Sequence, residues 1–171
     1  MPVLLAILAA VGGAIWWWIR TNPREALDTA QDLATTAINA PRRLAFRRQT
    51  NAHPVEGIDD ERIAICAIAQ AFIELDDLPT SEQREKLHSL ILAHSTCTNA
   101  EVREMEVLGR WLLTQCLDAP DAVRRLARRL RKIDTGASWD SLQEILAGLV
   151  TADLSTRQQS AIEDLNTAFR R

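Results

Sequence analysis

The chain has 171 residues, enough for one domain and a short appendage at the usual length of roughly 150 residues per domain. Its formal net charge of −3 argues against a nucleic-acid partner, because nucleic-acid-binding domains usually carry a clear basic excess. Tyr is absent, and Gly and Pro number only six each, which favours helices over sheets and predicts an all-α fold.

The first predicted element is a transmembrane helix over residues 1–20. Residues 2–19 carry no charge and would make a helix of about 27 Å, which just spans a bilayer core. No Lys or Arg precedes this run and three tryptophans close it, so it differs from a cleavable signal peptide. The alternative is a hydrophobic helix buried in a soluble core.

Arginines follow the span, so the positive-inside rule predicts an outer N-terminus and a cytoplasmic C-terminal domain of a bacterial inner-membrane protein. The residues expected at the membrane interface are Trp16, Trp17, Trp18, Arg20, Arg42, Arg43, Arg47 and Arg48. Small residues at four-residue spacing predict a smooth face for packing against another membrane helix, from a larger protein or a second copy. These are Ala6, Ala9, Ala10, Gly13 and Ala14.

Residues 21–56 are predicted to form an amphipathic helix and a basic linker. Asn22 and Pro23 are typical of a helix start, an apolar stripe follows, and Pro41 ends or kinks the helix. The arginine-rich segment 41–50 either lies on anionic headgroups or is a solvated linker, and both remain open. Turn residues at 51–57 place the domain boundary before a domain over 57–171.

This domain is predicted to be a compact helical bundle. The acids at 59–61 are expected in the first turn of a helix whose residues 63–75 are apolar nearly all round, which predicts the centre of the core. Thr80 and Thr98 are expected to begin two amphipathic helices, the second with a capping box. Further apolar stripes predict helices over 121–133 and 138–150, and a last helix carrying Ile162, Leu165 and Phe169.

Two segments of this domain are alike: 77–83 (DLPTSEQ) and 153–159 (DLSTRQQ), each between two predicted helices. This arrangement resembles the TerB-like (tellurite-resistance B) family, an all-helical domain of two pseudo-symmetric halves with an acidic turn in each. The resemblance covers about residues 58–171, but here the motif's Gly is replaced by Asp77 and Leu154, and its closing Glu by Gln.

The resemblance implies a metal site in the acidic turns, at Asp76, Asp77 and Asp153. A hard cation needs several anionic oxygens, and the second half offers only Asp153, so these acids are expected mainly to cap helices. The same domain type occurs in membrane-anchored co-chaperones beside a J-domain, but His53-Pro54-Val55 lacks the aspartate of that signature.

No nucleotide-binding, metalloprotease or serine-hydrolase motif occurs, so no catalytic residue and no organic cofactor are predicted. His53, His88 and His94 are expected to be surface or capping residues, with His88 and His94 on different sides of a helix. Cys66, Cys97 and Cys116 form no C-x-x-C pair and predict buried thiols in a reducing compartment, with a metal or redox role as the alternative.

A run of cations occupies one broad face of the predicted helix 121–133, where like charges repel unless an anion, an acidic protein or a lipid headgroup is nearby. A solvated face is the alternative. The members are Arg124, Arg125, Arg128, Arg129, Arg131 and Lys132.

These features predict a non-enzymatic accessory or scaffold protein that docks on a larger integral membrane complex, such as a respiratory complex or supercomplex, with anionic lipids as further partners. Self-association through the span is left open. The alternative is a tellurite or metal-stress response protein that binds a cation or an oxyanion.

Overall fold

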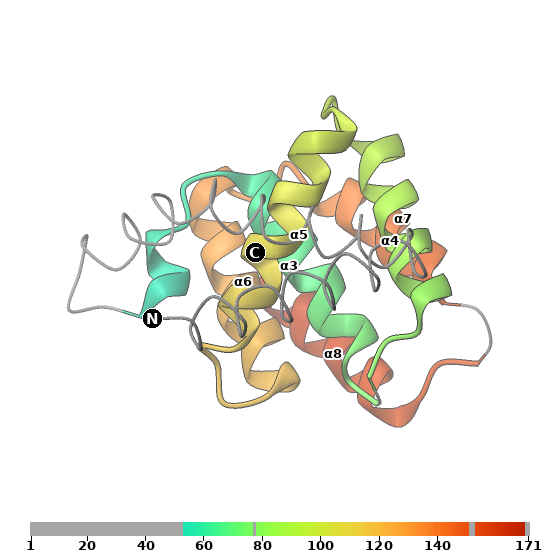
Figure 1. Ribbon diagram of the computed structural model, residues 1–171. Helices are drawn as coiled ribbons and strands as arrows, with labels where there is room; N and C mark the ends of the chain where they lie inside the picture. Colours follow the sequence, from blue (N-terminus) through green and yellow to red (C-terminus); the bar gives the residue numbers. More distant parts are fainter. Residues whose placement is uncertain (1–52, 77, 151–152, 170–171) are drawn as a thin grey trace, which may run out of the picture. The chain divides into compact units, whose positions relative to one another are not determined.

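The computed structural model describes residues 53–76, 78–150 and 153–169. All regular structure in these ranges is helical, which confirms the predicted all-α class. A short 3-10 helix precedes six α-helices that gather around α3 (Figure 1). The elements are η1 (Pro54–Gly57), α3 (Glu61–Ile73), α4 (Ser81–His94), α5 (Asn99–Leu113), α6 (Ala119–Asp134), α7 (Trp139–Leu149) and α8 (Thr156–Phe169).

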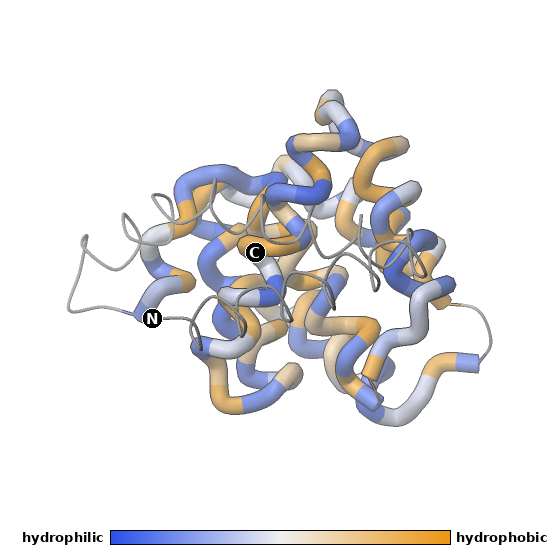
Figure 2. The backbone as a smooth tube through the Cα atoms, viewed as in Figure 1, coloured by the Kyte–Doolittle hydropathy of each residue, from blue (hydrophilic) through white to orange (hydrophobic). Residues whose placement is uncertain are grey.

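Helix α3 lies at the centre of the core, as its all-round apolar sequence predicts. Every residue from Ile63 to Ile73 is buried, because α4, α5, α6 and α7 all pack against this one helix. The outer helices instead alternate hydrophobic and hydrophilic residues along their length (Figure 2), since each has one face toward α3 or its neighbours and another toward solvent.

Side-chain caps set several of the helix starts. The hydroxyl of Thr80 accepts from the backbone N–H of Gln83, and the side chain of Gln83 accepts from the backbone N–H of Thr80. Thr98 and Glu101 form the same reciprocal pair at the start of α5. The predicted placement of 59–61 in the first turn of α3 is confirmed for Glu61 but wrong for the other two acids: Asp60 is the cap, and Asp59 precedes it. From the cap position, just outside the helix, the Asp60 carboxylate accepts from the N–H of Arg62.

Gly109 allows α5 to approach α3 closely. A Cβ atom at this position would lie 2.2 Å from Oε1 of Gln70 and 3.3 Å from Cα of Ala67. Gln70 is the only polar side chain among the buried residues of the described core, and its Nε2 donates to the backbone oxygen of Glu106 at 2.9 Å. The contact between these two helices therefore depends on a residue without a side chain.

The last two helices complete the bundle. Helix α8 packs mainly on α6, and α7 packs on α4 and α3. The rings of Trp139 and Phe169 stack with centroids 4.7 Å apart, so they join the start of α7 to the end of α8. Arg157 of α8 donates to the backbone oxygen of Leu75 at 2.9 Å, across 82 residues of sequence.

The three cysteines are free thiols, and their predicted burial is confirmed for Cys66 only, because Cys97 and Cys116 are half-buried. Burial raises the pKa of the Cys66 thiol, and it raises that of the half-buried Cys116 thiol to about 11. Both thiols are therefore protonated and weakly nucleophilic near neutral pH.

Candidate functional site

The predicted row of cations lies on α6, and the local sequence explains its placement. Asp118 caps the helix by accepting from the N–H of Asp121, and Pro120 occupies the first turn, where no N–H is needed. The helical period places Val123, Leu126 and Leu130 on the face that packs in the core. The cations lie between these residues in the sequence and therefore occupy the outer face of the helix. We call Arg124, Arg125, Arg128, Arg129, Arg131 and Lys132 the α6 cationic face.

Three members of the α6 cationic face pair with carboxylates of the same chain. The Nε atom of Arg125 lies 2.7 Å from Asp121, one turn earlier. Arg124 lies 3.7 Å from Asp164 of α8, and Lys132 lies 3.3 Å from Glu56 of η1. The hydrogen bond from Arg125 lowers the pKa of Asp121, which keeps this carboxyl ionised. The side chains of Arg124 and Lys132 remain 49% and 63% exposed in these pairs, so both cations can still contact an external anion.

The other three members bind only backbone carbonyl oxygens among the described residues. Arg128 donates to the oxygen of Arg124 at 3.2 Å, Arg129 to that of Ile58 at 2.5 Å, and Arg131 to that of Thr135. A carbonyl dipole satisfies a donor but does not cancel a full positive charge. The α6 cationic face therefore keeps three charges without a carboxylate partner in the described part of the chain.

One ridge of this face is the most accessible. Arg124, Arg128 and Lys132 follow one another at four-residue spacing, which places them in line along the helix, and all three are exposed. Neither of the two large hydrophobic residues that the structure exposes, Leu78 and Leu117, belongs to α6. The ridge therefore offers cations and no apolar anchor.

The structure describes only part of the repeated turns, in which the TerB-like resemblance implies a metal site. Asp76 and Asp153 are exposed, and Asp77 lies outside the described residues. Among the residues that are described, no group of three His, Cys, Asp or Glu side chains could hold a metal ion.

The glutamines of the repeated turns have a structural role instead. Gln83 accepts from the N–H of Thr80 at 2.9 Å and closes the cap of α4. Gln158 accepts from the N–H of Ser155 at 3.2 Å, while the Ser155 hydroxyl accepts from the N–H of Gln158 at 3.0 Å. The two turns thus form the same reciprocal cap, which accounts for their likeness without a ligand.

A half-buried polar cluster between α4 and α5 was missed by the sequence analysis. His88 lies 3.1 Å from Glu106 through one ring nitrogen and 3.1 Å from Asn99 through the other. Burial raises the pKa of Glu106, although the neighbouring His88 opposes that rise. Oε1 of Gln70 is buried close by without a hydrogen-bond partner. The only hint of this cluster in the sequence is Gln70, a single polar residue in an apolar helix, and the sequence does not indicate which residues it contacts.

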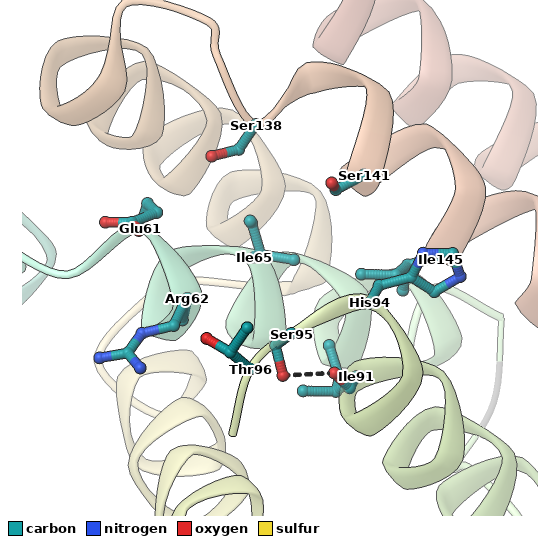
Figure 3. Close-up of a pocket in the computed structure, with 10 residues that line it drawn as sticks. All are labelled: Glu61, Arg62, Ile65, Ile91, His94, Ser95, Thr96, Ser138, Ser141 and Ile145. Atoms are coloured by element: carbon teal, nitrogen blue, oxygen red, sulfur yellow. Dashed lines mark hydrogen bonds between the residues drawn. The ribbon is translucent and has the colours of Figure 1, made fainter.

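A polar cleft of about 260 Å³ lies where the start of α3, the end of α4 and the start of α7 meet (Figure 3). Ile65, Ile91 and Ile145 supply its apolar lining, and Ser138 and Ser141 are among the polar residues beside them. His94 also lines the cleft, but its ring pairs with Glu144 at 3.1 Å and makes no hydrogen bond to either serine. A nucleophilic serine needs a base within hydrogen-bond reach, and this cleft has no such pair.

A second hollow, of 280 Å³, lies between α7 and α8 and is almost entirely apolar. Trp139 stands at one end, and Leu146, Leu154 and Ile162 lie along it. None of the described residues that line this groove is titratable, and the apolar lining is typical of a packing surface.

The predicted membrane residues lie outside the part of the chain that the structure describes. They are the interface residues Trp16, Trp17, Trp18, Arg20, Arg42, Arg43, Arg47 and Arg48, and the packing residues Ala6, Ala9, Ala10, Gly13 and Ala14. Within the described ranges, no helix is both long and apolar enough to cross a bilayer.

Comparison with known proteins adds no relative. The chain matches no family model, no curated protein sequence and no solved structure. The TerB-like resemblance is therefore still a prediction.

Proposed function

We propose that this chain is a non-enzymatic accessory or scaffold protein held to a membrane by residues 1–20, with the helical domain as its working part. The observation that carries the proposal is the uncharged run 2–19, closed by Trp16–Trp18 and followed at once by Arg20. A soluble bundle has little use for such a run, because the described domain already encloses a core of its own around α3.

The mechanism of this protein is tethering. An anchor in the bilayer raises the effective concentration of the domain near any other protein in the same membrane, so that a weak second contact becomes sufficient. The partner we propose is a larger integral complex of the bacterial inner membrane, such as a respiratory complex. The arginines that follow the span place the domain on the cytoplasmic side, where free thiols such as Cys66 stay reduced.

A binding role is also supported by how the polar side chains are used. The histidines and several acids of the described residues serve as caps or pair with neighbours: His53 accepts from the N–H of Val55, and Asp134 accepts from Gly136 and Ser138. The polar cleft holds no serine–histidine hydrogen bond among its described residues. Side chains occupied in this way stabilise structure and are poor candidates for chemistry.

The proposal is tested by fractionating cells that express the tagged full-length chain. We expect the protein in the membrane pellet, resistant to carbonate and released by mild detergent together with a larger complex. Recovery of the chain in the soluble fraction without detergent contradicts the anchor. Recovery from detergent of this chain alone contradicts the scaffold role.

The metal-response alternative makes a different prediction in the same preparation. If the acidic turns bind a cation, micromolar calcium or zinc should release heat in calorimetry and raise the melting temperature of the full-length chain. We expect neither, because Asp76 and Asp153 are exposed and belong to no described group of three ligands.

A further inference from the structure

The proposed tethering function assigns no role to the α6 cationic face. Its neighbour is η1, at the beginning of the described chain, which packs on α6. Arg129 holds the backbone oxygen of Ile58, and Lys132 pairs with Glu56. The polypeptide that comes from the N-terminal side therefore joins the bundle directly beside these cations.

We propose that the α6 cationic face binds the anionic phospholipid headgroups of the membrane that holds the anchor. This inference rests on the proposed function, because it assumes the tether, and it names the partner of one surface of the tethered domain. The helical domain then lies against the bilayer through α6 and leaves its other surfaces free for protein contacts.

Charge is the first reason for this assignment. Only three of the six cations have a carboxylate partner among the described residues, and the three that lack one are bound to backbone oxygens. An anionic headgroup layer supplies diffuse negative charge, and each Lys or Arg beside it contributes roughly fivefold in affinity.

The form of the surface is the second reason, and it favours lipid over an acidic protein. Protein interfaces usually centre on a buried aromatic or aliphatic anchor, and the exposed ridge of Arg124, Arg128 and Lys132 has none. A straight line of cations along a helix suits a laterally mobile layer of headgroups, which adjusts to the spacing of the charges.

Position is the third reason. The basic segment 41–48 directly precedes the turn that leads into η1, so the sequence continues the positive charge of α6 toward the anchor. Since η1 packs on α6, the α6 cationic face lies beside the beginning of the described chain.

The test uses the full-length chain inserted into nanodiscs of neutral phosphatidylcholine and immobilised by a tag. Vesicles of pure phosphatidylcholine, or of phosphatidylcholine with about a third phosphatidylserine, are passed over the surface. We expect binding of the anionic vesicles only, and loss of that binding as salt is raised, because exposed charges are screened.

Two variants with the same change in net charge separate this face from general electrostatics. The first carries Arg124→Gln, Arg128→Gln and Lys132→Gln on the exposed ridge of α6. The second carries Arg84→Gln, Lys86→Gln and Arg103→Gln on α4 and α5. We expect the first to bind anionic vesicles about a hundredfold more weakly and the second to stay within about twofold of the unmodified chain.

Each other result overturns the inference. Equal weakening in both variants means that net charge alone, and not the α6 cationic face, attracts the vesicles. Binding of polyglutamate but not of anionic vesicles assigns the face to an acidic protein. If the chain inserts into nanodiscs but does not bind anionic vesicles, the lipid contact is refuted and the tether still stands. If the chain does not insert, the proposed function itself is refuted.

Discussion

Helices α3 and α6 are neighbours in the bundle, but they use their side chains in opposite ways. Helix α3 is buried from Ile63 to Ile73, and this stretch is apolar except for Gln70, whereas α6 buries one stripe and presents cations on the rest of its surface. A helix enclosed on all sides carries the stability of the domain. A helix with one free face can carry function there at little cost in stability, so mutations in the two helices should have different consequences.

The largest effect is expected from Ile68→Ala in α3. Ile68 is fully buried, so the substitution leaves a cavity where several helices meet. We expect the free energy of unfolding to fall by about 2–5 kcal/mol, measured by urea denaturation of the detergent-solubilised chain. A loss below about 1 kcal/mol would show that α3 is not the centre of the stable core.

A smaller loss of stability is expected from Gly109→Ala, because α5 packs closely on α3 at this position. The new Cβ meets Gln70 Oε1 and crowds Cα of Ala67, so we expect about 1–3 kcal/mol of destabilisation. Adding Gln70→Ala should recover part of this loss, because the closer of the two contacts disappears. Simple additivity of the two changes in a double-mutant cycle would contradict a direct contact.

The end of α6 provides a test that depends on pH. The Asp134 carboxylate accepts from the backbone N–H groups of Gly136 and Ser138, each at 2.8 Å. Burial opposes its ionisation, but the hydrogen bond from the Ser138 side chain and those from the backbone outweigh burial and lower the pKa of Asp134. We expect Asp134→Asn to destabilise the protein by about 1 kcal/mol at pH 7.

The sign of the pH effect follows from the lowered pKa. The unfolded chain takes up this proton at a higher pH than the folded one, so the contribution of Asp134 is present above its ordinary pKa of about 4. It is lost as the pH falls below that value toward the folded pKa. Thermal melts at pH 7 and pH 3 should therefore show a smaller difference between the variant and the unmodified protein at the lower pH.

The smallest effect on stability is expected from Arg128→Gln in the exposed ridge of α6. Arg128 has no carboxylate partner among the described residues, and its hydrogen bond to the oxygen of Arg124 is exposed. We expect a change within about 0.5 kcal/mol in the same denaturation experiment. A loss of unfolding free energy comparable to that of Ile68→Ala would show that the outer face of α6 contributes to stability as much as the core helix α3 does.

Local structure in the described domain follows from the sequence. The apolar stripes predict each α-helix to within a few residues, and the predicted capping box at Thr98 is confirmed, whereas the matching box at Thr80 was not predicted. These features are short-range: a stripe depends on the helical period, and a cap joins residues three apart. The same locality explains why 77–83 and 153–159 were seen to be alike, although their shared reciprocal cap was not foreseen.

The pairing of polar groups that are distant in the sequence depends on the tertiary structure. Arg124 pairs with Asp164, Lys132 pairs with Glu56, and the Gln70 side chain donates to the backbone oxygen of Glu106, each contact joining residues tens of positions apart. No spacing in the sequence encodes such partners, because they depend on which helix faces lie against each other once the core has packed. For this reason the six cations of α6 look equivalent in the sequence, yet the fold neutralises three and leaves three without a carboxylate among the described residues.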